Sequence, residues 1–530
     1  MDIDNISFDP YLLSIIEAIS TSRFVALDLE LSGIPSKPPS GRVKHSLQNR
    51  YEEIKSAAEK YQILQIGITC VQEYEGVYVM RPYNFFLNPT VSEDLDIERI
   101  WSYQSGAVKF LLEHGFRMEA PYTEGVPYLS REEVMLVKQK LKVRLDKSKF
   151  DKDIIHIQGD DNIAFMDKVR AEIGAWEECK GLKTEVVIKT RNTATGLETA
   201  SDLTSFDRRL VHQLVRAEYP HLITFTRGRT IIVKPLDSER EKKYMENKKK
   251  ELRARIVRHT GFRWVIEALC GGNFGRIDLR SFGKDPTTGA AIFCDINDYS
   301  ARLNRARQTL ARSHPVIVGH NVFLDLVYLY KTFIGTLPAT IEEFGEAIHK
   351  LFPMIVDTKY LATHNCGDLI PASSLRDIEA MLRSQQKPEL ILHSDYGKYA
   401  MDELPHEAGY DSYLTARVAI QLSTRLEALG TYVDDSESAD EQLERPLSHL
   451  TLTTDQNTTQ MKVFLPMRRC GRFSNVNILY QESDLAVNMP PAESDFWRVY
   501  GNKLRVFGTF ENMLDLQILV SKNEQTTGAV

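Results

Sequence analysis

The amino-acid sequence predicts an α/β protein built on a mixed sheet, and two observations lead to this fold class. FVALDLEL, residues 24–31, reads as a strand, and residues 63–88 read as two β runs joined by a polar turn at Glu73–Gly76. Helical patterns flank the first strand, with DPYLLSIIEAI before it and YEEIKSAAEKY after it. A strand, a helix and then an antiparallel pair predict a mixed sheet flanked by helices.

The pattern changes near residue 145, which predicts an inserted small α/β domain over residues 146–258. This block reads as the helix DNIAFMDKVRAEIGAWEE, the strand TEVVIKT, the helix FDRRLVHQLVRAEY and a β-hairpin around Gly228. It ends in SEREKKYMENKKKELRARIVR, a helix rich in Lys and Arg. A solvated connector helix and a phosphate-tracking surface both explain that basic helix.

The remaining chain completes the predicted domain plan. Residues 1–145 and 259–432 carry the same α/β pattern and together form the first domain. The later part contains the buried strand SHPVIVGHN, the junction PMIVDTKYLA and the long helix HEAGYDSYLTARVAIQLSTRLEAL. An acidic linker at 433–449 has little to bury, and residues 450–520 predict a small C-terminal module.

Composition excludes several classes of protein. The 530 residues are enough for about three domains, and the net charge of −7 excludes a generally basic chain, so local patches or metals must hold any polyanion. The six cysteines form no C-x-x-C pair, which favours reduced thiols over a zinc site or a disulfide framework. The N-terminus lacks a secretory pattern and no apolar run is long enough for a bilayer. We therefore expect no membrane contact and a cytoplasmic or nuclear location.

The strand FVALDLEL carries two acidic side chains in an otherwise apolar run. Because side chains two apart on a strand share a face, Asp28 and Glu30 point one way and Leu27, Leu29 and Leu31 the other. Two adjacent carboxylates raise each other's pKa unless a cation lies between them. The pattern indicates either a metal site or an edge strand with a solvated polar face.

Two further segments place acidic residues near helix starts. In VIVGHNVFLDL, the strand ends at Gly319 and Asp325 lies on the first turns of the next helix, where the helix dipole alone explains it. In HEAGYDSYLT, His406 precedes a helix and Asp411 follows five residues later. A capped helix with an incidental histidine explains this segment, and Tyr410 in place of a second His excludes an H-E-x-x-H zinc site.

Together these three segments resemble, in order and context, the DEDD exonucleases of the DEDDh subtype. Over roughly residues 15–430 the chain resembles the poly(A)-specific ribonuclease (PARN) group of 3′-exoribonucleases, which includes small-RNA-trimming relatives. WSYQSGAVKFLLEHGFRMEA, GVPYLSREE and FGEAIHKLFPMIVDTKYLA also match. In the last of these segments, Asp357 could take a direct catalytic role or act as a helix N-cap. Two regions depart from the pattern: the segment at 271–312 is longer than expected, and residues 450–520 match the group's RNA-recognition domain poorly.

The resemblance implies a ribonuclease H-like fold and hydrolysis of single-stranded RNA from its 3′ end, with release of 5′-mononucleotides. The RNA ends would be poly(A) tails or tails of small noncoding RNAs. It further implies two Mg²⁺ ions about 3.5–4 Å apart, with Mn²⁺ able to substitute. The implied ligands are Asp28, Glu30, Asp325 and Asp411, and His406 is the implied general base.

Further expectations concern RNA contacts and assembly. Ser32 and Gly33 follow the D-x-E pair and would lie near the terminal nucleotide. Arg208 and His212 form the R-x-x-x-H of the single-stranded nucleic-acid-binding domain that the group carries at this place. The resemblance also implies a homodimer, and the C-terminal module would be a degenerate RNA-recognition fold.

Two other functions remain open. A DEDDh DNA exonuclease would use the same carboxylates, although the R-x-x-x-H segment and the PARN-like spacers argue against it. A catalytically inactive RNA-binding scaffold is the second alternative, and the five intact motif residues argue against that.

Overall fold

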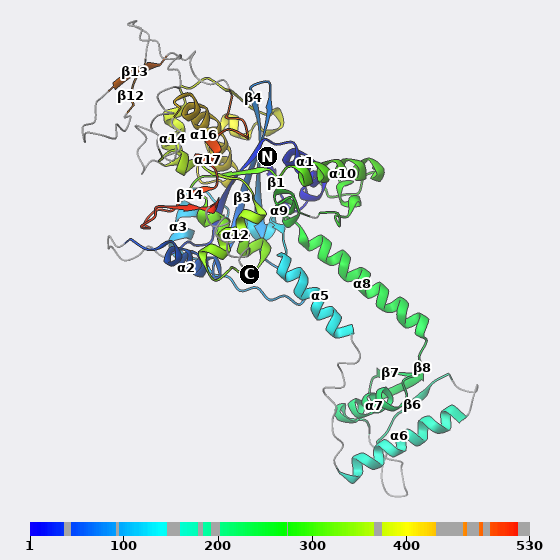
Figure 1. The fold of residues 1–530 in the computed structure, drawn as a ribbon. Helices are drawn as coiled ribbons and strands as arrows, with labels where there is room; N and C mark the ends of the chain where they lie inside the picture. The colour runs from blue at the N-terminus through cyan, green and yellow to red at the C-terminus, as the bar shows by residue number, and fades with distance from the viewer. Residues whose placement is uncertain are drawn as a thin grey trace, which may run out of the picture. The chain divides into compact units, whose positions relative to one another are not determined.

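The computed structural model describes residues 1–35, 44–91, 95–145, 159–178, 184–191, 202–272, 274–364, 374–430, 459–463, 476–480 and 488–517. The chain divides into two compact units (Figure 1). We call residues 1–135 with 256–530 the sheet unit, and residues 136–255 the inserted unit. Within the described residues, no helix combines the length and apolar character needed to cross a membrane.

An eight-stranded mixed sheet forms the centre of the sheet unit. In spatial order its strands are β1 (Asp2–Ile3), β4 (Val77–Asn88), β3 (Ile63–Tyr74), β2 (Phe24–Leu31), β9 (Val316–Gly319) and β10 (Ile355–Asp357), with β5 (Val126–Pro127) and β11 (Glu389–Leu392) also paired to β4. β2, β3 and β4 are antiparallel neighbours, whereas β9 and β10 run parallel to β2. This confirms the predicted mixed sheet.

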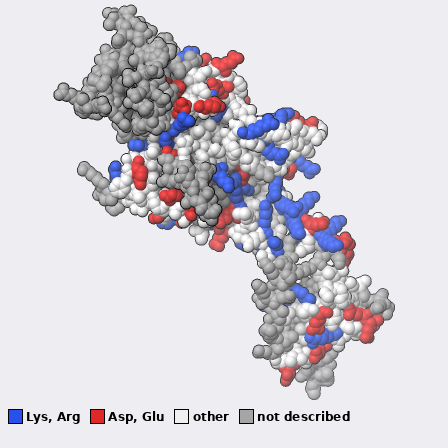
Figure 2. Space-filling model, viewed as in Figure 1, with Lys and Arg blue, Asp and Glu red and all other residues white. Residues whose placement is uncertain are grey.

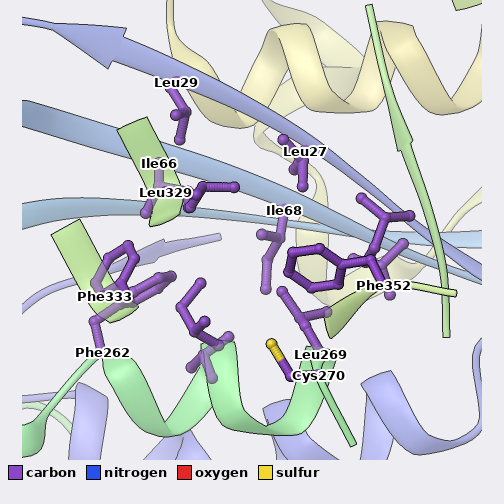
Figure 3. Close-up of a cluster of buried hydrophobic side chains, with 14 of the residues drawn as sticks. Leu27, Leu29, Ile66, Ile68, Phe262, Leu269, Cys270, Leu329, Phe333 and Phe352 are labelled. Atoms are coloured by element: carbon purple, nitrogen blue, oxygen red, sulfur yellow. The ribbon is translucent and has the colours of Figure 1, made fainter. Parts of the chain in front are cut away.

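The first face of the sheet carries the larger apolar core. Leu27 and Leu29 of β2 and Ile66 and Ile68 of β3 point into it (Figure 3). The helices that cover this face are α1 (Phe8–Ser20), α2 (Leu47–Ala58), α9 (Arg263–Leu269), α10 (Ile296–Arg312), α11 (Phe323–Leu329) and α12 (Ile341–Leu351). The predicted orientation of the leucines is therefore confirmed, because all three leucines of FVALDLEL are buried in this core.

The second face is covered chiefly by the predicted long helix, α16 (Ala408–Ala428). Phe24 and Ala26 of β2 point into this second core. Because alternate side chains of a strand share one face, Asp28 and Glu30 also point toward α16. Three shorter helices pack beside α16: α13 (Thr358–Leu361), α14 (Leu375–Leu382) and α17 (Phe496–Tyr500). The acidic pair thus lies on the face opposite the leucines.

Short elements complete the sheet unit. They are α3 (Ser105–Glu113), α4 (Ala120–Thr123), η3 (Leu279–Phe282), η4 (Tyr330–Ile334), η5 (Ser394–Tyr396), α15 (Lys398–Met401), β12 (Thr459–Val463), β13 (Val476–Tyr480), β14 (Lys503–Arg505) and β15 (Met513–Asp515). Residues 488–517 belong to the same core as the sheet. There the Asn502 N–H donates to the carbonyl of Ile355 on β10 at 2.8 Å, and its side chain accepts from the Ile355 N–H at 2.9 Å. β12 and β13 form an antiparallel pair, and the rest of the range 450–487 lies outside the described residues.

The inserted unit has a core of its own. Its three-stranded sheet has the order β6 (Val186–Ile188), β8 (Thr230–Pro235), β7 (Leu222–Arg227), and α6 (Asp160–Glu178) and α7 (Ser205–Glu218) pack on it. The predicted hairpin around Gly228 is present, with Gly228 at φ 61° in the turn. Two helices cross the boundary between the units in sequence, α5 (Arg131–Leu145) and the basic helix α8 (Ser238–Thr260). Lys and Arg side chains cover much of α8 (Figure 2).

Candidate active site

Three elements bring the predicted acidic residues together at the α16 face of the sheet. Asp28 and Glu30 lie on β2, Asp325 lies in the first turn of α11, and Asp411 lies in the first turn of α16. One ligand atom each from Glu30, His406 and Asp411 lie within 4.8 Å of one another. Residues far apart in the sequence therefore meet in one cluster.

Close packing of α16 on β3 places Asp411 beside β2. Gly67 is the β3 partner of Asp28, and a Cβ atom at this glycine would lie 1.9 Å from the carbonyl oxygen of Ala408. Only a residue without a side chain allows the helix to approach so closely. The first N–H groups of α16 are satisfied by the sheet, because Gln65 accepts from Ala408 at 2.9 Å and Asn84 accepts from Gly409 at 3.2 Å. Sequence reasoning missed these positions; the polar Gln65 within the apolar run ILQIGITC was the available signal.

His406 and Asp411 are joined through the main chain. The N–H of His406 donates to the Asp411 carboxylate at 3.2 Å. His406 has a φ of 64°, a left-handed conformation that non-glycine residues adopt rarely and that recurs at functional sites. The turn before α16 therefore fixes the histidine and the acid relative to each other.

Asp357 organises the loop that leads to Asp325. Its fully buried carboxylate caps α13 by accepting the N–H of Lys359 at 2.9 Å, and it accepts the N–H of Asn321 at 2.7 Å. It also accepts the N–H of Arg505, in β14, at 2.9 Å. Asn321 has a φ of 58°, so Asp357 holds a strained turn two residues before α11. These contacts give Asp357 the N-cap role and a positioning role.

A histidine in the same loop is also fixed. The hydroxyl of Thr358 donates to the carbonyl of Gly319 at 3.1 Å, so it accepts from the Nδ1–H of His320 at 2.9 Å. Burial lowers the pKa of His320 to about 3, with the Lys359 charge acting in the same direction. His320 is therefore a neutral structural group of this loop.

The carboxylates of the cluster hold their protons unusually tightly. Burial, and then the charges of Asp411 and Asp325, raise the pKa of both Asp28 and Glu30 well above their ordinary values. Burial also raises the pKa of Asp325 to about 8 and that of Asp411 to about 6, the latter partly offset by the His406 N–H. Negative charges gathered in this way favour a bound cation.

The ring of His406 packs against α3. Its centroid lies 4.7 Å from that of Phe110 and 4.2 Å from that of His114, both with edge-on geometry. Burial lowers the pKa of His406, and the nearby His114 and Arg376 act in the same direction. Phe110 is 40% exposed, so an aromatic face lies beside the cluster.

Ser32 and Gly33, which follow the D-x-E pair, make intramolecular contacts. Ser32 is fully buried, and its hydroxyl donates to the carbonyl of Ser102 at 2.8 Å and accepts the N–H of Gln62 at 2.9 Å. Gly33 is buried against the ring of Tyr61, which a Cβ would approach to 2.6 Å. Both positions are thus engaged in intramolecular packing, and their contact with a terminal nucleotide stays a prediction.

Arg208 and His212 lie on α7 of the inserted unit. Arg208 donates to the carbonyl of Gly228 at 2.7 Å, at the hairpin turn. The ring nitrogens of His212 lie 2.6 Å and 3.0 Å from the hydroxyls of Thr224 and Thr226. Burial lowers the pKa of His212, as do the charges of Arg216 and Arg208. Both side chains therefore contact the β7–β8 hairpin. They lie in the inserted unit, whereas the carboxylates lie in the sheet unit.

Comparisons with known proteins match most of the chain. The family described as "CAF1 family ribonuclease" matches residues 3–419. The poly(A)-specific ribonuclease PARN of Xenopus laevis is 24% identical over 465 residues, which cover 84% of this chain and 66% of that protein. The poly(A)-specific ribonuclease PNLDC1 of Mus musculus is 26% identical over 443 residues, which cover 80% and 71%. This chain therefore spans just under two-thirds of the frog protein's length.

A comparison of solved structures aligns the Mg²⁺- and Mn²⁺-bound form of S. pombe Pop2p. The alignment covers 82% of this chain and 94% of that one, with a TM-score of 0.34 and 12% sequence identity.

Proposed function

The chain belongs to the CAF1 family of ribonucleases, and from this premise we propose that it is a metal-dependent exonuclease that shortens single-stranded RNA from the 3′ end. The observation that carries the proposal is the meeting of Glu30, His406 and Asp411 within 4.8 Å, next to Asp28 and Asp325. The substrates would be poly(A) tails or tails of small noncoding RNAs, and the products 5′-mononucleotides.

The donor set fits divalent metal ions. Asp28, Glu30, Asp325 and Asp411 supply the hard carboxylate oxygens that Mg²⁺ and Mn²⁺ prefer. Burial raises the pKa of all four, and the charges of Asp411 and Asp325 add to the shift of Asp28 and Glu30, so a bound cation would stabilise their ionised forms. We propose these four residues as the ligands of two ions, which when bound would activate water and stabilise the leaving 3′-oxygen.

Proton transfer and base stacking would be carried out by side chains beside the cluster. We propose His406 as the general base: it lies beside the acidic cluster, and its lowered pKa keeps the imidazole neutral and able to accept a proton. Phe110 and His114 cover one side of this ring and restrict its rotation. The His406 N–H holds the Asp411 carboxylate in place. Phe110, partly exposed, would offer a surface on which a base can stack.

The inserted unit would supply a second RNA contact. Arg208 is partly exposed, and the exposed rings of Phe206 (44%) and Phe225 (43%) offer stacking surfaces in the same unit. We keep Arg208 and His212 as proposed contacts to single-stranded RNA. A homodimer and a cytoplasmic or nuclear location belong to the same proposal, and sedimentation of the purified chain would measure the first.

A digestion assay tests the proposal. The purified chain is incubated with 3′-labelled A-tailed, U-tailed and heteropolymer RNAs and with DNA of matched sequence, in Mg²⁺ or in EDTA. We expect release of labelled 5′-mononucleotide from RNA in Mg²⁺ and none in EDTA. Faster digestion of DNA would assign the chain to the DNA exonucleases, and RNA binding without hydrolysis would make it a scaffold.

A further inference from the structure

A cavity of about 730 Å³ opens between α1, α10 and the β3–β4 strands. Gln72 and Arg81 line it; they lie two residues from Cys70 and Tyr83, respectively, and therefore face the same side of the sheet as the first core. The proposed metal ligands Asp28 and Glu30 face the other side of the sheet. Arg81 pairs with Cys70, which in turn pairs with Val25 near the start of β2. The cavity is therefore separate from the acidic cluster.

Helix α10 gives the cavity a cationic wall. Arg302, Arg305 and Thr309 line the cavity from one face of this helix, at spacings of three and four residues. α10 lies within the 271–312 segment that departs from the PARN-like pattern. Figure 2 shows Lys and Arg side chains gathered over this part of the sheet unit. The departure from the pattern thus adds basic residues to a cavity.

Two of the lining arginines have no acidic partner. Arg302 is neutralised by Glu17, to which it donates twice, at 2.8 Å and 2.6 Å. Arg81 is partly buried and donates to Gln72, whose amide oxygen carries no charge. Arg305 is exposed, and among the described residues no carboxylate lies within ion-pair distance of Arg81 or Arg305. A partly buried arginine without a counter-ion favours an anionic ligand.

The other polar groups of the lining do not neutralise the charges of Arg81 and Arg305. Asp395 is the one other acid in the lining, and its side chain is 66% exposed. His393 accepts the N–H of Asp395 on Nδ1 at 3.4 Å, which leaves the ring proton on Nε2 as a donor. Tyr11, partly buried, adds an aromatic ring to the wall. Guanidinium groups beside an aromatic ring are suited to a phosphate attached to a base.

We infer that this cavity binds the phosphate group of a nucleotide, with Arg81 and Arg305 as its anchors. Its volume lies within the range of about 300–1,000 Å³ found for small-molecule sites. The phosphate comes either from a free 5′-mononucleotide or from the backbone of RNA. Choosing a nucleotide over other phosphates rests on the proposed function; the anion site itself rests on the arginines.

Equilibrium binding to the full chain tests this inference. Affinity for AMP, adenosine and a 12-nucleotide oligo(A) is measured by calorimetry in EDTA, for the wild type, Arg305→Glu and Arg307→Glu. Arg307 is an exposed arginine of the same helix that does not line the cavity, so it controls for the change in net charge. Arg81→Gln provides a second test inside the cavity.

We expect Arg305→Glu and Arg81→Gln to weaken binding of a phosphate-bearing ligand by about tenfold or more, because each loses a charged hydrogen bond. Arg307→Glu should bind as the wild type does. An effect on AMP identifies a free nucleotide as the ligand, and an effect confined to oligo(A) identifies RNA. Equal affinities across all variants, or the same loss for adenosine as for AMP, would overturn the inference. EDTA keeps hydrolysis out of this measurement, so failure of the proposed function would not affect it.

Discussion

The main-chain N–H of His406 donates a hydrogen bond to the carboxylate of Asp411 at 3.2 Å. This bond ties the proposed general base to a proposed metal ligand, and the left-handed φ of 64° at His406 turns the histidine ring toward α3. Loss of the ring should leave this main-chain bond intact. The two proposed roles can therefore be separated by substitution.

His406→Ala should slow hydrolysis by about 10²–10⁴-fold, the usual contribution of a general base. Binding of Mn²⁺, followed by calorimetry, should persist because the carboxylates remain. His114→Ala is the comparison variant: its ring lies 4.2 Å from that of His406, and its loss should slow hydrolysis much less because only a contact to the His406 ring is removed. Equal losses in the two variants, or an unchanged rate in His406→Ala, would remove the general-base role.

Asp357→Asn should lower the free energy of unfolding by about 1–3 kcal/mol, because a buried amide cannot accept all the N–H groups that the carboxylate accepts. The rate should also fall, since Asn321 would no longer be held before α11. Denaturant unfolding and the digestion assay measure the two effects. Asp377→Asn, in the exposed capping box of α14, should cost less stability and leave the rate unchanged. A fully active Asp357→Asn would rule out the positioning role.

Gly67→Ala should destabilise the sheet unit by about 1–3 kcal/mol and abolish most of the activity. The added methyl group would meet the main chain of Ala408, which can retreat only by moving α16 and Asp411 away from β2. Gly106→Ala is the control, because nothing lies within 4 Å of its Cβ position and alanine favours the helix. If thermal unfolding and activity of Gly67→Ala match the wild type, the close approach is not required.

The Arg99–Glu133 ion pair should make stability depend on pH in the acid range. Burial works to raise the pKa of Glu133, but the hydrogen bonds and charge of Arg99 and the Ser130 N–H outweigh it and hold the pKa below the ordinary 4.5. Because the folded-state pKa is lowered, the stabilisation is complete above pH 4.5 and is lost as the pH falls through the folded-state pKa.

Glu133→Gln should therefore cost about 3 kcal/mol at pH 7, where it leaves the largely buried Arg99 without its acidic partner. The difference from the wild type should shrink below pH 4.5, as measured by denaturant unfolding at a series of pH values. A difference that is independent of pH would contradict the ion-pair explanation.

Sequence reasoning went furthest where the pattern is local. The alternation in FVALDLEL was enough to place Leu27 and Leu29 in one core and to turn Asp28 toward the opposite face. The long helix after His406 and the hairpin around Gly228 also follow from local pattern and turn chemistry. The joint order of the three acidic segments then supplied the resemblance.

Features that depend on contacts between distant segments could not be predicted. Nothing near Gly67 in the sequence indicates that the main chain of Ala408 will contact it. Likewise, nothing near Asp357 indicates that its carboxylate will accept the N–H of Arg505. The hydrogen bonds of the Ser32 hydroxyl with Ser102 and Gln62 likewise join segments that are distant in sequence. Such roles appear only once the chain has folded and the partners are known.

Digestion of a 5′-labelled, A-tailed RNA in Mg²⁺ by the wild type and by Asp325→Asn tests the central claim most directly. Asparagine keeps the size of the side chain but cannot ionise to bind a cation, and thermal unfolding verifies that the variant is folded. We predict a ladder of products shortened stepwise from the 3′ end with the wild type and intact RNA with Asp325→Asn. Equal digestion by the two folded proteins would contradict the assignment of these carboxylates as the active site.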